Sequence, residues 1–135
     1  GDKEREVLGR WESEYAAKSE SGSGKVISTC GLLGGLRNEM LLMSCLDLML
    51  SMDSANMHLA SLVATPVVSV WGATHPFTGF MGWNQSPENA IQIPLECRPC
   101  SIYGQKPCLR GDYACMRNIA PEQIVNRVEL ILNQY

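Results

Sequence analysis

Apolar residues recur at helical spacing in several segments of the chain. Near the start, Val7, Leu8, Trp11 and Tyr15 fall at three- to four-residue spacing, the pattern of a surface helix with one apolar face. Near the end, Pro121 stands where the first residue of a helix is expected, because that position needs no N–H donor. The predicted helices cover residues 2–18, 37–45, 54–63 and 121–133. In the second of these, Leu36, Met40 and Met43 are expected to face inward.

Short apolar runs between the helices predict strands. Residues 67–71 read Val-Val-Ser-Val-Trp, which is typical of a strand covered on both faces. Similar runs predict strands at 25–30, 48–52 and 90–93, and the run at 48–52 is expected to be buried. A long loop is expected at 72–88 and a cysteine-rich loop at 97–115. Because strands and helices alternate, the pattern predicts an α/β domain with a mostly parallel sheet.

Composition and charge exclude several classes of function. The chain has 135 residues and a net charge of −3, which suits one globular domain. No Lys or Arg lies between Arg37 and Arg98, so the basic stripe of a nucleic-acid-binding protein is absent from the sequence. The most apolar stretch, residues 40–52, contains Asp47 and is shorter than the ~20 residues of a membrane span. No transmembrane segment is therefore expected.

Residues 53–58, Asp-Ser-Ala-Asn-Met-His, are the most informative for chemistry. They follow a predicted strand and open a predicted helix, and ligands of open α/β sheets bind beyond the carboxyl ends of strands. The unpaired N–H groups of a helix N-terminus suit a phosphate. His58 is expected to be neutral there, because the helix dipole disfavours a cation, and a neutral imidazole still donates one hydrogen bond. The alternative is that Asp53 or Ser54 only caps the helix.

Several further short motifs follow this segment along the chain. They are Ala64-Thr-Pro66, Trp71-Gly-Ala-Thr-His-Pro76, Cys97-Arg-Pro-Cys100, Cys108, Cys115-Met116 and Ile119-x-Pro-Glu. Together with residues 53–58, this order resembles glycosyltransferase family nine, the ADP-heptose:lipopolysaccharide heptosyltransferases, over residues 35–128. The sequence departs from the family at Ala55-Asn56, where Gly-Pro is common, and at Ala64, where Gly is common. Ala55 keeps a small side chain beside a diphosphate, and Asn56 adds a polar group that would change which sugar is bound.

The resemblance implies the C-terminal half of a GT-B fold, with a Rossmann-like parallel sheet and flanking helices. Residues 1–135 would then be a partial, apparently incomplete nucleotide-sugar-binding domain. Such an enzyme transfers a heptose or related sugar, with inversion, from a nucleoside diphosphate (ADP first) to a lipopolysaccharide core acceptor. The general base is expected in another domain, so no catalytic residue is expected in this chain, and neither a cofactor nor a metal is expected. The residues implied in donor binding are Asp53, Ser54, Ala55, Asn56 and His58.

The resemblance also implies a cytoplasmic protein, at the inner face of the membrane where the acceptor is built. An incomplete sheet would leave apolar edges open, so either self-association of this chain or dependence on upstream residues is expected. Two other functions stay open from the sequence. One is a non-catalytic nucleotide- or nucleotide-sugar-binding module, and the other is an interaction domain stabilised by zinc.

Four cysteines form a second candidate site: Cys97, Cys100, Cys108 and Cys115. Four thiolates could hold a structural zinc, although a standard zinc ribbon has a second Cys-x-x-Cys pair. Two disulfides are a further alternative, which the reducing cytosol implied by the resemblance disfavours. The favoured interpretation is reduced thiols in a packed loop.

Aromatic side chains in the long loop allow two interpretations. These residues are His75, Phe77, Phe80 and Trp83. Their side chains either contact the donor sugar at the edge of its site or anchor the loop to the domain. Trp71 is expected to pack at the end of its strand.

Overall fold

The computed structural model describes residues 2–18, 24–32 and 34–134. The chain falls into two compact units, Gly1–Glu39 and Met40–Tyr135. Their boundary lies within helix α2 (Gly35–Met43). The candidate donor-binding residues and the cysteine-rich loop belong to the second unit.

Helix α1 (Asp2–Lys18) makes up most of the first unit, and its bounds confirm the predicted helix. The strand predicted at 25–30 is wrong, because residues 24–29 form no strand. The backbone N–H of Ser28 donates instead to Oε1 of Glu12 (3.2 Å). An apolar run becomes a strand only where a neighbouring strand bonds to its backbone, and the described residues offer this segment no such neighbour.

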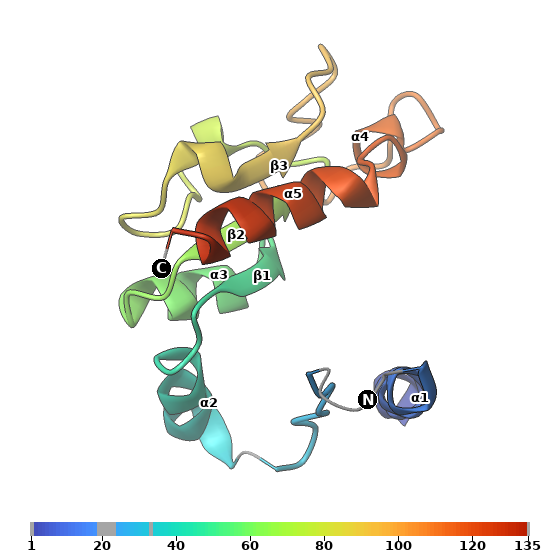
Figure 1. Cartoon of the computed structure of the whole chain (residues 1–135). Helices are drawn as coiled ribbons and strands as arrows, with labels where there is room; N and C mark the ends of the chain where they lie inside the picture. Colours follow the sequence, from blue (N-terminus) through green and yellow to red (C-terminus); the bar gives the residue numbers. More distant parts are fainter. Residues whose placement is uncertain (1, 19–23, 33, 135) are drawn as a thin grey trace. The chain divides into compact units, whose positions relative to one another are not determined.

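A three-stranded parallel sheet forms the centre of the second unit (Figure 1). The strands β1 (Met49–Met52), β2 (Val67–Trp71) and β3 (Ala90–Gln92) lie in the order β1-β2-β3. Helix α3 (Ala55–Leu62) connects β1 to β2, and α4 (Ala114–Arg117) and α5 (Pro121–Leu132) follow β3. These elements confirm the α/β class and the three strands predicted beyond residue 47.

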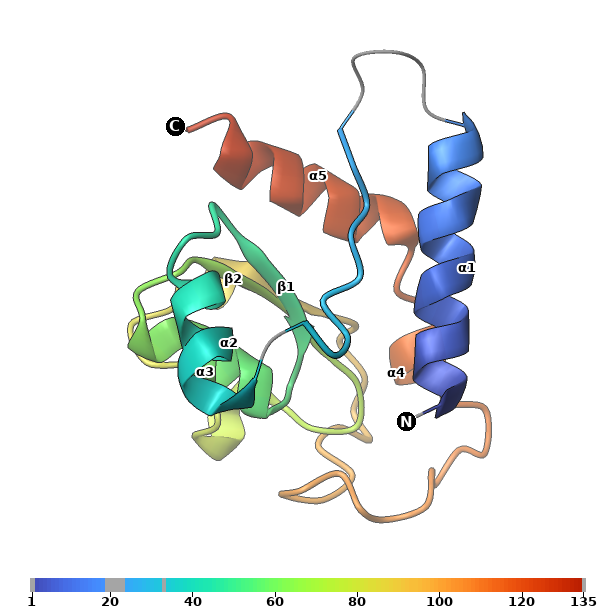
Figure 2. The same ribbon diagram turned by 90° about the horizontal axis from the view of Figure 1, so that it is seen from below.

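The core of the second unit is built around β2, whose five residues are all buried. Helix α3 packs against β1 and β2, and α5 packs against β2 from the other face of the sheet (Figures 1 and 2). Val67 and Trp71 join Met57 of α3 and Met43 of α2 in one cluster. Because side chains alternate along a strand, the intervening valines of β2 point to the face that α5 covers. This double cover explains why β2 is apolar throughout.

Strand β1 is less buried than its apolar run predicts. Leu50 is 50% exposed and Met52 is 47% exposed, so the expectation of a fully buried strand is wrong. The parallel register places these two side chains beside Val68 and Val70, on the face of α5. Helix α5 packs against β2, and it leaves the neighbouring part of β1 open.

Helices α2, α3 and α5 follow the predicted bounds within two residues, whereas α4 was not predicted, because its residues fall at and beyond the end of the expected cysteine-rich loop. Met43 is buried, as expected, whereas Leu36 is 53% exposed, so its predicted inward position is wrong. Pro121 opens α5 as predicted, and Oε1 of Gln123 accepts a hydrogen bond from the backbone N–H of Ala120 (3.0 Å). Nε of Arg127 then donates to Oδ1 of Asn89 (2.8 Å), which ties α5 to the turn before β3.

Ala64 occupies the turn between α3 and β2 with a φ of 62°, in the left-handed region. An alanine there is strained by about 1–2 kcal/mol relative to glycine. This strain explains why glycine is common at this position in the family that the sequence resembles. Relief of this strain raises the free energy of unfolding, and the entropy that glycine gains in the unfolded chain offsets part of the increase. We therefore expect Ala64→Gly to raise the free energy of unfolding by about 0.5–1 kcal/mol. Urea denaturation measures the change. Ala64→Val is the matched control and should destabilise the protein; a loss of stability in the glycine variant would contradict the argument.

Candidate functional site

The segment predicted as the donor site forms the turn from β1 into α3 (Figure 1). Asp53 extends the sheet by one bond, because its backbone N–H donates to the carbonyl of Val70 (3.2 Å). Ser54 is the N-cap residue with extended backbone (φ −154°, ψ 172°), and Ala55 begins the helix. The structure therefore brings Asp53, Ser54 and the first turn of α3 together at the carboxyl end of β1.

Neither candidate cap side chain caps α3, so that interpretation is wrong. Oγ of Ser54 lies 3.1 Å from Oγ of Ser51. The side chain of Asp53 is half-buried and makes no hydrogen bond or ion pair with any described residue. The backbone N–H groups of Ala55 and Asn56 likewise have no acceptor in the described chain, as is usual in a first helical turn. One carboxylate and two N–H donors are thus left unpaired in the same turn.

Met57 is the one residue of segment 53–58 that is fully buried, and it has a structural role. Its side chain lies in the core and holds the first turn of α3 against β2. Ala55 and Asn56 are exposed, and His58 is half-buried. Ala55 has no positive φ, so the backbone here does not require the glycine that the family commonly has. Donor binding by these residues stays a prediction.

Arg98 is a structural residue that the sequence analysis missed. Its guanidinium donates to four backbone carbonyls, those of Gly72, Ile93 (2.7 Å), Trp71 (3.3 Å) and Thr74 (2.8 Å). It thereby joins the loops that follow β2 and β3 at the same edge of the sheet as Asp53. Burial lowers the pKa of Arg98, and this effect exceeds the opposing influence of nearby thiols. A lone basic residue after a long stretch without Lys or Arg was the available signal.

The aromatic residues of the long loop do not act as one group. Phe80 packs against the core and against Tyr103 (ring centroids 5.6 Å apart), so it pins the loop as predicted. Phe77 is 94% exposed and Trp83 is 77% exposed, so neither pins the loop. Trp71 is fully buried, and its Nε1 donates to Oγ of Ser69 (2.8 Å).

All six cysteines are free thiols, so the two-disulfide alternative is wrong. Sγ of Cys100 donates to the carbonyl of Cys97 (3.4 Å). Within the described ranges, no group of three or more His, Cys, Asp or Glu side chains is arranged to hold a metal ion.

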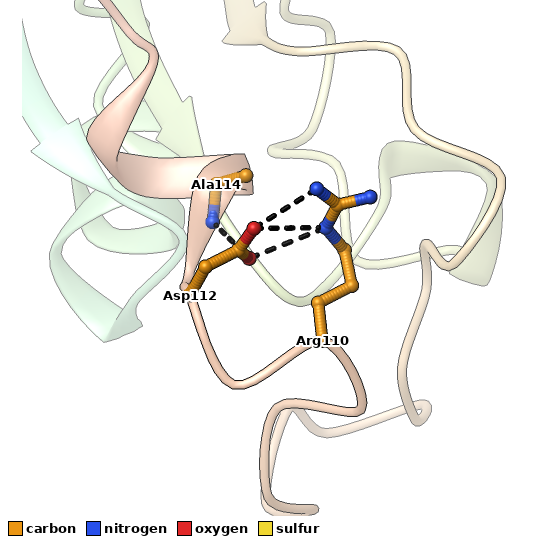
Figure 3. Close-up of polar contacts among 3 residues, drawn as sticks. All are labelled: Arg110, Asp112 and Ala114. Carbon is orange, nitrogen blue, oxygen red and sulfur yellow. Dashed lines mark hydrogen bonds and ion pairs between the residues drawn. The ribbon is translucent and has the colours of Figure 1, made fainter.

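The end of the cysteine-rich loop is fixed by a polar cluster (Figure 3). The carboxylate of Asp112 accepts hydrogen bonds from the guanidinium of Arg110 (2.9 Å to Nη2) and from the backbone N–H of Ala114 (3.1 Å). The Arg110 hydrogen bond, followed by that of Ala114, lowers the pKa of Asp112. Asp112 therefore holds the loop against the start of α4.

Two thiols of the loop should differ in reactivity. Backbone N–H groups, foremost that of Tyr113, lower the pKa of Cys108, whereas burial raises the pKa of Cys100. Because the thiolate is the nucleophile, we expect iodoacetamide to alkylate Cys108 roughly several-fold faster than Cys100 at neutral pH. Mass spectrometry of a quenched time course measures both rates. The rates should converge in urea, and equal rates in the native protein would refute the assignment.

Comparisons with known proteins agree on one family. A family model described as "Glycosyltransferase family 9 (heptosyltransferase)" matches residues 12–108. A lipooligosaccharide heptosyltransferase 2 of Campylobacter jejuni subsp. jejuni serotype O:2 is 29% identical over 86 residues, which cover 64% of this chain and 26% of the relative. Its counterpart from serotype O:6 is 28% identical over 83 residues, covering 62% and 25%. The chain thus spans about a quarter of the length of these curated relatives.

No solved structure shows significant similarity to the chain. Among the described residues, none of the helices has the length and apolar character that a membrane crossing requires.

Proposed function

Because the chain belongs to glycosyltransferase family 9, the heptosyltransferases, we propose that it binds the nucleotide sugar of a heptosyl transfer reaction. In this proposal residues 1–135 are part of the C-terminal donor-binding domain of a GT-B enzyme. The donor is an ADP-linked heptose or related sugar, and the acceptor is a lipopolysaccharide core. The general base comes from the acceptor domain, and the reaction takes place in the cytoplasm at the inner face of the membrane.

The observation that carries the proposal is the set of unpaired groups at the turn from β1 into α3. The N–H groups of Ala55 and Asn56 and the positive end of the helix dipole suit a diphosphate. The unpaired carboxylate of Asp53 can accept hydrogen bonds from sugar hydroxyls. Ser54 and His58 lie in the same segment and can donate to the phosphates.

This arrangement supports the departure of a nucleoside diphosphate. When the acceptor hydroxyl attacks the anomeric carbon, the bond from that carbon to the phosphate oxygen breaks and negative charge grows on the phosphates. Donors already aimed at that charge stabilise the transition state more than the ground state. In the proposal, the first turn of α3 provides these donors.

A single substitution tests the phosphate contact without disturbing the helix. Proline is favoured at the first helical position and the preceding Ser54 is extended, so Ala55→Pro removes one N–H at little cost to the fold. We expect isothermal titration of the full-length protein to show binding of ADP ahead of UDP and GDP. The affinity for ADP should fall about tenfold or more in Ala55→Pro.

Ala55→Ser keeps the N–H and is the matched control, with affinity near that of the unchanged protein. Failure of every nucleotide to bind would refute the proposal. Binding of ADP without transfer to a lipopolysaccharide core acceptor would instead support the non-catalytic binding module.

A further inference from the structure

An open cavity of about 390 Å³ lies beyond the carboxyl ends of β2 and β3. Gln92, the last residue of β3, forms one side, and His75 of the loop after β2 forms another. The remaining walls come from the segment that follows β3: Pro94, Leu95, Glu96 and Arg98. None of these residues belongs to the turn from β1 into α3, and the proposed nucleotide contacts leave this cavity unused.

Gln92 carries a feature that the fold alone does not explain. Its Oε1 is buried and has no hydrogen-bond partner among the described residues. Buried side-chain oxygens nearly always have a partner, so Gln92, which also lines the cavity, is a candidate to bind a group held there. The last side-chain torsion of glutamine is soft and roughly two-fold, which lets the amide turn either its oxygen or its nitrogen to the cavity.

Hydrogen bonds to the backbone also fix the orientation of His75 and Arg98, two other polar side chains that line the cavity. Nδ1 of His75 accepts from the backbone N–H of Phe77 (3.1 Å), so the proton of the neutral ring is on Nε2. Burial, and then the positive charge of Arg98, lower the pKa of His75, which keeps the ring neutral at pH 7. Arg98 donates four of its N–H groups to backbone carbonyls, which leaves one Nη1–H without an acceptor in the described chain.

This lining suits a neutral polyol better than an anion. The charges of Arg98 and Glu96 offset each other, and a phosphate would meet the carboxylate of Glu96 with one guanidinium N–H to bind it. A hydroxyl group both donates and accepts, so it can pair with an amide, an imidazole or a carboxylate. Pro94 and Leu95 add an apolar wall that fits the C–H face of a sugar ring.

We propose that this cavity binds a sugar ring, with Gln92 as its central hydrogen-bonding residue. The cavity lies at the same edge of the sheet as Asp53 and two strands away, which is about 10 Å at the usual strand spacing. A saccharide held here is therefore a neighbour of the proposed nucleotide site. The ring belongs either to the donor or to the acceptor, and both share the chemistry that the cavity recognises.

The test uses Gln92→Leu in the full-length protein. This change removes the amide and also the unpaired buried oxygen, so the fold should be as stable as before or more stable. We expect saturation-transfer NMR titrations with a methyl heptoside and a methyl mannoside to show saturable binding. The dissociation constant should rise about tenfold or more in Gln92→Leu, and Gln105→Leu, a change outside the cavity, should leave it unchanged.

The remaining outcomes separate this proposal from the nucleotide site. Sugar binding should persist in Ala55→Pro, so failure of the nucleotide site would leave this result intact. In transfer assays of Gln92→Leu, a raised KM for the nucleotide sugar identifies the donor ring and a raised KM for the acceptor identifies the acceptor ring. The proposal is overturned if neither glycoside binds, if the dissociation constant is the same in Gln92→Leu, or if inorganic phosphate displaces the glycoside.

Discussion

Replacing Asp53 with asparagine should lower turnover of the full-length enzyme about 100-fold or more while leaving the fold intact. The loss is the scale expected when one transition-state contact is removed. Asparagine has nearly the same shape and still fits the turn, but it carries no charge and presents one acceptor oxygen to the sugar hydroxyls. Turnover with a saturating nucleotide sugar and a lipopolysaccharide core acceptor measures the effect.

The structure shows that Asp53→Asn removes no structural contact of the side chain. Even had Asp53 capped α3, the change would have been mild, because asparagine caps helices about as well as aspartate. The side chain of Asp53 has no partner among the described residues, so Asp53→Asn should change the free energy of unfolding by less than about 0.5 kcal/mol. Asp47→Asn, at an exposed acid of the same unit, is the matched control and should keep full turnover. Unchanged turnover in Asp53→Asn would return Asp53 to a purely structural role.

Replacing Arg98 with lysine should destabilise the protein by about 3 kcal/mol or more. One guanidinium joins four carbonyls from the loops after β2 and β3, and a lysine ammonium cannot reach all of them. Each hydrogen bond from a charged donor contributes about 1.5–3 kcal/mol, and partly buried carbonyls are left without a donor. Urea denaturation, followed by circular dichroism, measures the loss.

The control for Arg98 lies in the cysteine-rich loop. Arg110 pairs with Asp112 at an exposed site, so Arg110→Lys should change the unfolding free energy by about 0.5 kcal/mol or less. Equal stability of the two variants would show that the carbonyl contacts of Arg98 contribute little to the fold.

Elements that are fixed by their own residues could be predicted from the sequence. The run from Val67 to Trp71 is apolar on both faces, and the structure covers it on both faces. The same kind of run failed at 25–30, because no strand bonds to it among the described residues. It was only half right at β1, where Leu50 and Met52 are about half exposed. An apolar run indicates that a segment can be buried. Whether it is buried depends on the elements that pack beside it in the folded chain.

The candidate site divides in the same way. Residues 53–58 could be located because a strand, a turn and a helix start follow one another within the segment itself. Arg98 and Gln92 could not, because their surroundings come from parts of the chain far away in sequence. Arg98 bonds to Trp71, and Gln92 faces a cavity shared with His75. A pattern of neighbouring residues in the sequence does not predict contacts of this kind.

The burial of β2 on both faces also determines where this protein can be redesigned. The five residues of β2 belong to the core, whereas the polar groups at the sheet edge come from the last residue of β3 and from the loops that follow β2 and β3. A combinatorial library restricted to positions 73–75 and 92–96 would vary the surface proposed to bind a sugar and leave the residues of β2 unchanged. A library that included β2 would yield mainly unfolded variants, because close-packed interiors tolerate few changes of volume. Directed evolution of the proposed sugar site should therefore begin in those two segments.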